Sequence, residues 1–166
     1  MNYAKIKPVD VANGEGVRVS LFVSGCTHHC KGCFNAELWD HEAGEPFSFH
    51  TIREILELCS KDYVSGLSLL GGEPLDPRNV ERMTDLCYLF KRYFPHKTIW
   101  CYTGYKWDVI KHLPILKHID VLVDGKFVQD LADPRLKFRG SSNQRIIMVK
   151  QSLESGQIYL RKDLMG

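Results

Sequence analysis

The chain has 166 residues, of which 44% are hydrophobic and 25% are charged. These values are typical of a globular domain and exclude a disordered, fibrous or disulfide-rich scaffold. The 22 lysines and arginines against 20 aspartates and glutamates leave a net charge of +2, and the basic residues are scattered along the chain. We therefore expect no nucleic-acid partner, since nucleic-acid-binding proteins concentrate positive charge on one face. The length predicts one domain, residues 1–166.

The N-terminal residues lack the apolar stretch of a signal peptide, and no apolar run approaches the length of a membrane-spanning helix. We expect a cytoplasmic protein with no membrane partner. Three of the six cysteines, Cys26, Cys30 and Cys33, fall within eight residues, whereas the others are far apart. In a reducing cytoplasm, such clustering favours metal ligation or catalysis over disulfide bonds.

The first predicted strand covers residues 17–24, where side chains alternate with a period of two, between the turn signal Asn13-Gly14 and the cysteines. A helix of about three turns follows, because apolar residues recur there at helical spacing. These residues are Ile52, Ile55, Leu56 and Cys59. A second strand over residues 66–70 ends at Gly71-Gly72.

The pair Asp76-Pro77 predicts the start of a second helix, because aspartate caps free amides and proline suits the first helical position. Its expected buried face consists of Val80, Met83, Cys87 and Phe90. Further strands are predicted over 98–102, 121–123 and 145–149, with a short helical piece near 107–112.

Strands that alternate with helices imply right-handed crossovers and a mainly parallel sheet. A closed eight-unit barrel needs about 250 residues, so this chain is long enough for only part of one. The predicted fold is therefore α/β, a partial and open βα barrel of about five mainly parallel strands. Residues 125–143 form the one long connection, and long ordered loops are often functional.

The ends of four predicted strands carry the residues of chemical interest. The strands run into Cys26, Gly71-Gly72-Glu73-Pro74, Thr103-Gly104 and Asp124-Gly125-Lys126. Ligands of parallel α/β folds bind at the carboxyl ends of strands, so we expect these segments to meet at one edge. Glycines at 71 and 72 would allow a ligand close to the backbone, and Glu73 could accept hydrogen bonds from an ammonium group. A plain turn after the strand is the alternative.

The spacing C-x3-C-x2-C lets one loop supply three thiolates to an iron–sulfur cluster, which four cysteines usually hold. The fourth iron would then have no protein ligand and could bind a substrate. Catalytic zinc sites likewise leave one coordination position open for a substrate. Two alternatives are a zinc site completed by His28 or His29, and three free buried thiols. Cys59, Cys87 and Cys101 lie on apolar faces, so we assign them to the core. Phe22, Trp100 and Met148 are likewise expected in the core rather than in contact with a cofactor.

The cysteine motif followed by GGEP resembles the radical S-adenosylmethionine superfamily. Further segments resemble its subfamily that activates anaerobic ribonucleoside-triphosphate reductase, and they span nearly the whole chain. These segments are VSGCTHHCKGCFN at 23–35, Trp39-Asp40, TGY at 103–105, VDGKF at 123–127 and FRGSSNQR at 138–145. The superfamily motifs are specific, and FRGSSNQR indicates the subfamily.

The resemblance implies that Cys26, Cys30 and Cys33 ligate a [4Fe-4S] cluster whose open iron is chelated by the amino and carboxylate groups of S-adenosylmethionine. It implies that Gly71, Gly72 and Glu73 hold the methionyl amino end, while Gly32, Cys33 and Phe34 lie against the adenosine. One electron from the cluster would break a carbon–sulfur bond of the sulfonium. The resulting 5'-deoxyadenosyl radical would take a hydrogen atom from a glycine of the reductase.

Two positions depart from the wider pattern. Gly32 stands where the superfamily often has an aromatic residue, so an adenine contact there would come from the backbone or from Phe34. Asp124 and Lys126 resemble a D-x-K element of the related pyruvate formate-lyase activase, which has an aspartate where Cys101 aligns here. We assign Asp124 to the cofactor contacts and keep Lys126 as a candidate catalytic residue.

The expected partners are the anaerobic reductase, whose glycine loop would enter through the open side, and a low-potential electron donor such as flavodoxin or ferredoxin. Three classes of function remain open. The first is a radical activase that acts on a protein, either the reductase or another glycyl-radical enzyme such as pyruvate formate-lyase. The second is a radical enzyme that acts on a small molecule, and the third is a zinc-stabilised binding module.

Overall fold

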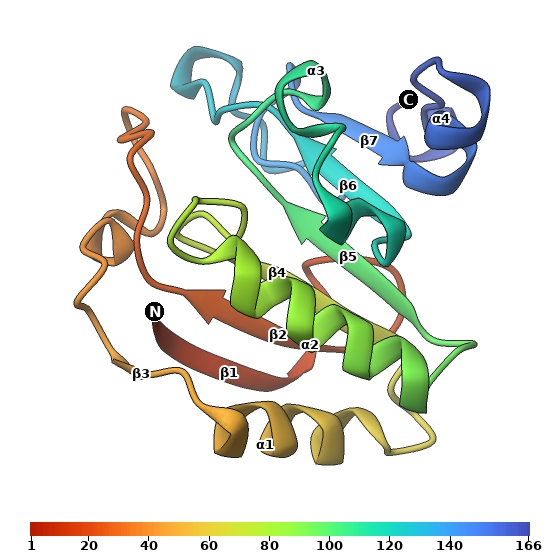
Figure 1. The fold of residues 1–166 in the computed structure, drawn as a ribbon. Coiled ribbons are helices and arrows are strands. Elements are labelled where there is room, and N and C mark those ends of the chain that lie inside the picture. Colours follow the sequence, from red (N-terminus) through yellow and green to blue (C-terminus); the bar gives the residue numbers. More distant parts are fainter.

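A seven-stranded sheet, in the order β3-β1-β2-β4-β5-β6-β7, forms the centre of the molecule (Figure 1). The computed structural model describes residues 1–166. β2, β4, β5 and β6 are parallel neighbours, whereas the pairs β1–β2, β1–β3 and β6–β7 are antiparallel. The strands are β1 (Asn2–Asp10), β2 (Arg18–Val23), β3 (Glu45–Pro46), β4 (Gly66–Gly71), β5 (Thr98–Tyr102), β6 (Val121–Asp124) and β7 (Arg145–Met148).

The longer helices lie between the parallel strands in sequence. The α-helices are α1 (Phe49–Cys59), α2 (Val80–Tyr93), α3 (Trp107–Ile110) and α4 (Val149–Ser155). Short 3-10 helices cover Ala36–Leu38, Pro114–Lys117, Gln129–Leu131 and Lys162–Leu164. None of the helices is both long enough and apolar enough to span a bilayer.

The α/β class and all five predicted strands are confirmed, and the parallel centre of the sheet agrees with the prediction. The last predicted strand, β7, differs in direction because it pairs antiparallel with β6. β1 and β3 were not predicted. β1 carries Lys5, Lys7 and Pro8 and is mostly half-buried or exposed, so it lacks the apolar alternation that marks the inner strands.

The predicted start of the second helix at Asp76-Pro77 is wrong by three residues, since α2 begins at Val80 after Asn79. Asp76 instead organises a turn ahead of the helix. Its Oδ1 accepts the N–H of Arg78 at 2.9 Å, and its carbonyl accepts the N–H of Asn79 at 2.8 Å. Aspartate favours such local turns as much as it favours helix caps.

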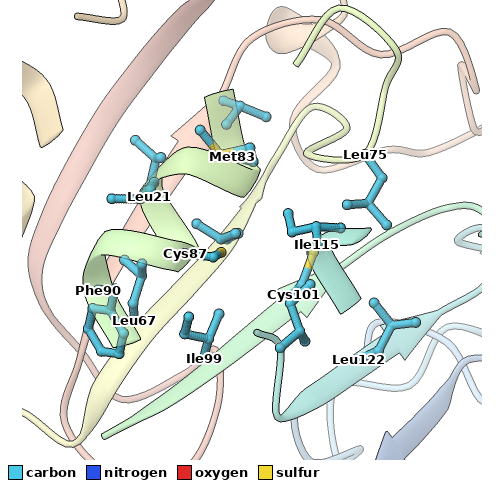
Figure 2. Close-up of a cluster of buried hydrophobic side chains, with 14 of the residues drawn as sticks. Leu21, Leu67, Leu75, Met83, Cys87, Phe90, Ile99, Cys101, Ile115 and Leu122 are labelled. Atoms are coloured by element: carbon cyan, nitrogen blue, oxygen red, sulfur yellow. The ribbon is translucent and has the colours of Figure 1, made fainter. Parts of the chain in front are cut away.

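One face of the sheet packs against α1 and α2 and holds the main apolar core (Figure 2). Met83, Cys87 and Phe90 of α2 point toward side chains of the central strands, as predicted, while Val80 is only half-buried. Cys59, Cys87 and Cys101 are all fully buried, which confirms their assignment to the core. Burial raises the pKa of the Cys59 thiol to about 12, so this group stays neutral.

The opposite face of the sheet is covered by loops, short 3-10 helices and the C-terminal segment instead of α-helices. Phe22 packs with Leu38 and Leu70, and Trp100 packs with Val121, Val123 and Ile146. The burial of Phe22 and Trp100 is confirmed, and half-buried Met148 packs against the Trp100 cluster. We call this the inner face, because it leads to the cavity described below.

Asp10 anchors a buried polar network on the inner face, at the end of β1. Its carboxylate accepts hydrogen bonds from the Ser20 hydroxyl at 2.6 Å, the Asn13 side chain at 2.7 Å and the Ala12 N–H at 2.8 Å. Burial alone raises the pKa of Asp10, but these hydrogen bonds outweigh burial and hold the pKa below its ordinary value of 3.8.

A carboxyl group with a lowered folded-state pKa stabilises the fold above its unfolded pKa and loses that contribution as the pH falls. We therefore expect the free energy of unfolding to fall more between about pH 5 and about pH 3 in the native protein than in Asp10→Asn. Denaturant titrations of both proteins across this range measure the difference. Parallel pH profiles would show that Asp10 does not contribute in this way.

Candidate functional site

A cavity of about 340 Å³ opens at the carboxyl ends of the parallel strands. Its walls come from the ends of β4 and β5, from the loops after β2, β4 and β5, from residues 12–13 and from the connection between β6 and β7. The predicted convergence of the strand ends is therefore found in the structure. The volume lies within the range of about 300–1,000 Å³ that is usual for small-molecule and cofactor sites.

Cys26, Cys30 and Cys33 all line this cavity as free, half-buried thiols. Their loop has little backbone hydrogen bonding, since no N–H from Thr27 to Gly32 donates to a backbone carbonyl. Burial raises the pKa of the Cys26 thiol, and the backbone of His28 and His29 offsets this rise only in part. The Asn35 N–H donates to the sulfur of Cys33 at 3.4 Å, and such a hydrogen bond stabilises a thiolate, which is the form that ligates metals.

The glycine pair after β4 brings the second loop against the cysteine loop. Gly71 has φ +117°, and a Cβ there would lie 2.5 Å from the backbone nitrogen of Val23. A Cβ on Gly72 would lie 2.6 Å from the carbonyl oxygen of Gly25. Both glycines line the cavity, but the close approach that they permit is first of all between two parts of this chain.

Glu73 is buried and uses both carboxylate oxygens within the protein. Oε1 accepts the Gly104 N–H at 2.7 Å and lies 2.8 Å from His28 Nε2, while Oε2 accepts the Leu75 N–H at 2.9 Å and the Thr103 hydroxyl at 2.8 Å. Both oxygens of the carboxylate are therefore engaged within the chain. Glu73 joins the loops that follow β2, β4 and β5.

Comparison with known proteins assigns the family. A family model described as "4Fe-4S single cluster domain" matches residues 12–147. Anaerobic ribonucleoside-triphosphate reductase-activating proteins of Enterobacteria phage T4 and Haemophilus influenzae are each 47% identical to this chain over 146 and 150 residues. Both alignments cover 88% of this chain, and they cover 93% and 97% of the relatives. The Escherichia coli K12 protein of that name is 45% identical over 148 residues, 87% of this chain and 96% of its own length.

The chain belongs to the family of anaerobic ribonucleoside-triphosphate reductase-activating proteins. The subfamily predicted from FRGSSNQR and the superfamily motifs is thereby confirmed, as is the iron–sulfur class of the domain.

The three cysteines of the protein fit a four-iron cluster with three protein ligands, because their thiols come from one loop and line one cavity. The zinc alternative needs His28 or His29 as a ligand. His28 pairs with Glu73, and the ring of His29 stacks on Trp39 with centroids 4.3 Å apart. No set of three His, Cys, Asp or Glu side chains is arranged to hold a single metal ion.

The segment after Cys30 carries Gly32 and Phe34, two of the residues that the resemblance places against the adenosine. Phe34 lines the cavity, is 75% exposed, and packs on Phe127 with ring centroids 5.1 Å apart. Gly32 does not line the cavity. Its φ of +75° and its approach to Gln129, where a Cβ would lie 2.7 Å from the side-chain nitrogen, explain why glycine suits this position.

Asp124 and Lys126 do not line the cavity. Buried Asp124 accepts hydrogen bonds from Arg145 at 2.9 and 2.6 Å and from the Trp107 N–H at 2.8 Å. Its carboxylate therefore ties β6 to β7 and to the start of α3 and does not face the cavity. Lys126 is exposed at the start of the long connection.

Several cavity residues of this family member were not predicted as site residues. Asn13, Tyr102 and Gln144 line the cavity, as does His28, which the sequence suggested only as a zinc ligand and which lies 2.8 Å from Glu73. Tyr102 could have been found from the two-residue period of β5, which places it on the same face as Trp100. Asn13 and Gln144 lie outside the strands, where no periodic pattern in the sequence indicates which way a side chain points.

Proposed function

We propose that this chain is an iron–sulfur radical enzyme that generates the glycyl radical of an anaerobic ribonucleoside-triphosphate reductase, with S-adenosylmethionine as co-substrate. The observation that carries the proposal is the placement of three free thiols around one cavity in a chain of this family. When bound, the cluster and S-adenosylmethionine supply reductive cleavage of a sulfonium bond and, through it, abstraction of a hydrogen atom.

In this proposal, Cys26, Cys30 and Cys33 hold the cluster. The backbone around Gly71 and Gly72 receives the methionyl end of the co-substrate, because both residues line the cavity next to the cysteine loop. Glu73 acts as a positioning residue, since its carboxylate fixes the loops after β4 and β5 and also His28. Cys33 and Phe34 form the adenosine side, with Phe34 as the residue that supplies an aromatic surface, while Gly32 lies outside the cavity and permits the turn that leads to them.

The open side needed for a protein substrate follows from the one-sided arrangement of the helices. α1 and α2 cover one face, whereas loops cover the inner face beside the cavity (Figure 1). We extend the proposal to a partial, open βα barrel within a single domain, through whose open side the reductase presents its glycine segment. Lys126 is exposed at the start of the connection from β6 to β7, and the ion pair of Asp124 with Arg145 fixes the end of β6 just before it.

The remaining parts of the proposal concern the surroundings of the reaction. The electron donor is a low-potential protein such as flavodoxin or ferredoxin, because reductive cleavage requires a cluster near the low end of the range of about −700 to +450 mV. The reaction takes place in the cytoplasm, without membrane or nucleic acid.

The test mixes reduced, reconstituted protein, S-adenosylmethionine and the reductase without air. We expect an EPR signal of a glycyl radical on the reductase and a matching amount of 5'-deoxyadenosine by chromatography. Pyruvate formate-lyase and small-molecule candidates serve as competing acceptors. Radical formation on one of those instead of the reductase would contradict the proposed substrate while leaving the radical chemistry in place.

A further inference from the structure

Three cavity-lining side chains have a buried polar atom without a hydrogen-bond partner. They are the indole N–H of Trp39, the hydroxyl of Tyr102 and Nε of Arg139. Each can donate a hydrogen bond, and leaving a buried donor unpaired costs about 1–3 kcal/mol. Buried polar groups in native proteins nearly always have a partner, so a group of such atoms in one cavity indicates a ligand rich in acceptors.

These donors do not all lie in the same part of the cavity. Trp39 follows the 3-10 helix Ala36–Leu38, and its ring stacks on His29 of the cysteine loop. Tyr102 ends β5, and Arg139 lies on the connection from β6 to β7. The cysteines and Gly71–Glu73 follow β2 and β4, on the other side of β5 in the sheet. Tyr102, whose ring also packs against the Phe22–Leu70 cluster, lies between those residues and the connection that carries Arg139. We call the part of the cavity lined by Tyr102 and Arg139 its second half, next to the half that we assign to the cluster and co-substrate.

A glycine segment as substrate imposes a particular kind of recognition. The reacting residue has no side chain, so a protein can hold it only through backbone N–H and C=O groups and through its neighbours. A hydroxyl suits this task because it can donate to a carbonyl and accept from an N–H. Resting on the proposed function, we propose that the Tyr102 hydroxyl binds the backbone of the reductase's glycine segment in the second half of the cavity.

The surroundings of Tyr102 suit this role. Its ring packs between the Phe22–Leu70 cluster and the Trp100 cluster, which fixes the ring on the inner face. Burial raises the pKa of Tyr102, so the group remains a neutral hydroxyl. Arg139 holds the connection by donating to the carbonyls of Ser142 at 3.2 Å and Gln144 at 2.9 Å, and this leaves its Nε as a second donor.

Tyr102→Phe tests this assignment with little structural disturbance, because the hydroxyl has no partner within the chain. We expect a higher midpoint of denaturant unfolding, because the substitution removes a buried donor without a partner. Cluster content and the effect of S-adenosylmethionine on the EPR spectrum of the reduced cluster should be unchanged. The reductase concentration for half-maximal glycyl-radical formation should rise about threefold to tenfold, which corresponds to one hydrogen bond. Tyr93→Phe on α2, 68% exposed, is the matched control and should alter none of these quantities.

Two results would overturn the assignment. An altered EPR effect of S-adenosylmethionine in Tyr102→Phe, with unchanged dependence on the reductase, would show that the hydroxyl contacts the co-substrate. No change in the EPR effect or in the dependence on the reductase would show that it contacts neither. Failure of the native protein to form any glycyl radical is a separate outcome, because it removes the proposed function itself.

Discussion

Cys30→Ala is expected to leave the anaerobically reconstituted protein without its four-iron cluster, and Cys26→Ala and Cys33→Ala should do the same. All three thiols line the cavity, and together they are the protein's whole ligand set in our proposal. Two remaining thiolates would leave two irons without a protein ligand. The measurements are iron and sulfide content and the brown absorption of the cluster, followed by assay of S-adenosylmethionine cleavage, which should be abolished.

The matched control is Cys59→Ala, a replacement of the same type at a fully buried site on α1. It should keep a full cluster and lose only packing, of order 1 kcal/mol in the free energy of unfolding. Cys87→Ala and Cys101→Ala should behave alike. A full complement of iron in Cys30→Ala, or stoichiometric zinc without iron in the native protein, would refute the assignment of the ligands.

Glu73→Gln is expected to have the second largest effect. The least costly placement of the amide puts its nitrogen at the position of Oε2, where the Thr103 hydroxyl can reverse and accept. The N–H of Leu75 cannot reverse, so it would face another donor. Together with the loss of charge-assisted bonds, this should lower the free energy of unfolding by about 2–3 kcal/mol.

The same substitution should weaken binding of S-adenosylmethionine, because Glu73 fixes the glycine loop relative to His28 of the cysteine loop. A displacement of about 1 Å at a reacting centre can lower a rate about 10²-fold. Urea unfolding and the cofactor concentration that perturbs the EPR spectrum measure the two effects. Glu81→Gln, at an exposed position in the first turn of α2, is the control. Native stability and native binding in Glu73→Gln would show that the four hydrogen bonds do not organise the site.

The inner strands and the cysteine site were predictable because their signals are local. β2, β4, β5 and β6 are short apolar runs, and the cysteines lie in a single loop with a specific spacing. β1 was not predictable in the same way, because its residues, Lys5 and Lys7 among them, are mostly half-buried or exposed and show no buried period. The direction of β7 depends on the path of the connection after β6. That path leaves no periodic pattern in the sequence, so the antiparallel pairing could not be predicted.

The roles of individual polar residues were harder to predict than their presence. The sequence places Glu73 and Asp124 at strand ends, but it does not show that neighbouring loops occupy their carboxylates. Those partners, Gly104 and Arg145, are 31 and 21 residues away in the sequence. Tyr102 was predicted only as a strand residue with no functional role. In the structure it lines the cavity, and its hydroxyl has no hydrogen-bond partner.

The scarcity of backbone hydrogen bonds between Thr27 and Gly32 has a consequence for how the protein tolerates oxygen. Regions with few such bonds open at low free energy, whereas strands such as β2 and β4 open only with the whole domain. If oxygen damaged the cluster, the cysteine loop would therefore be the first part of the protein to unfold locally. The sheet and its helix-covered core would stay folded, so that a chain that has lost its iron remains a scaffold on which a cluster can be rebuilt.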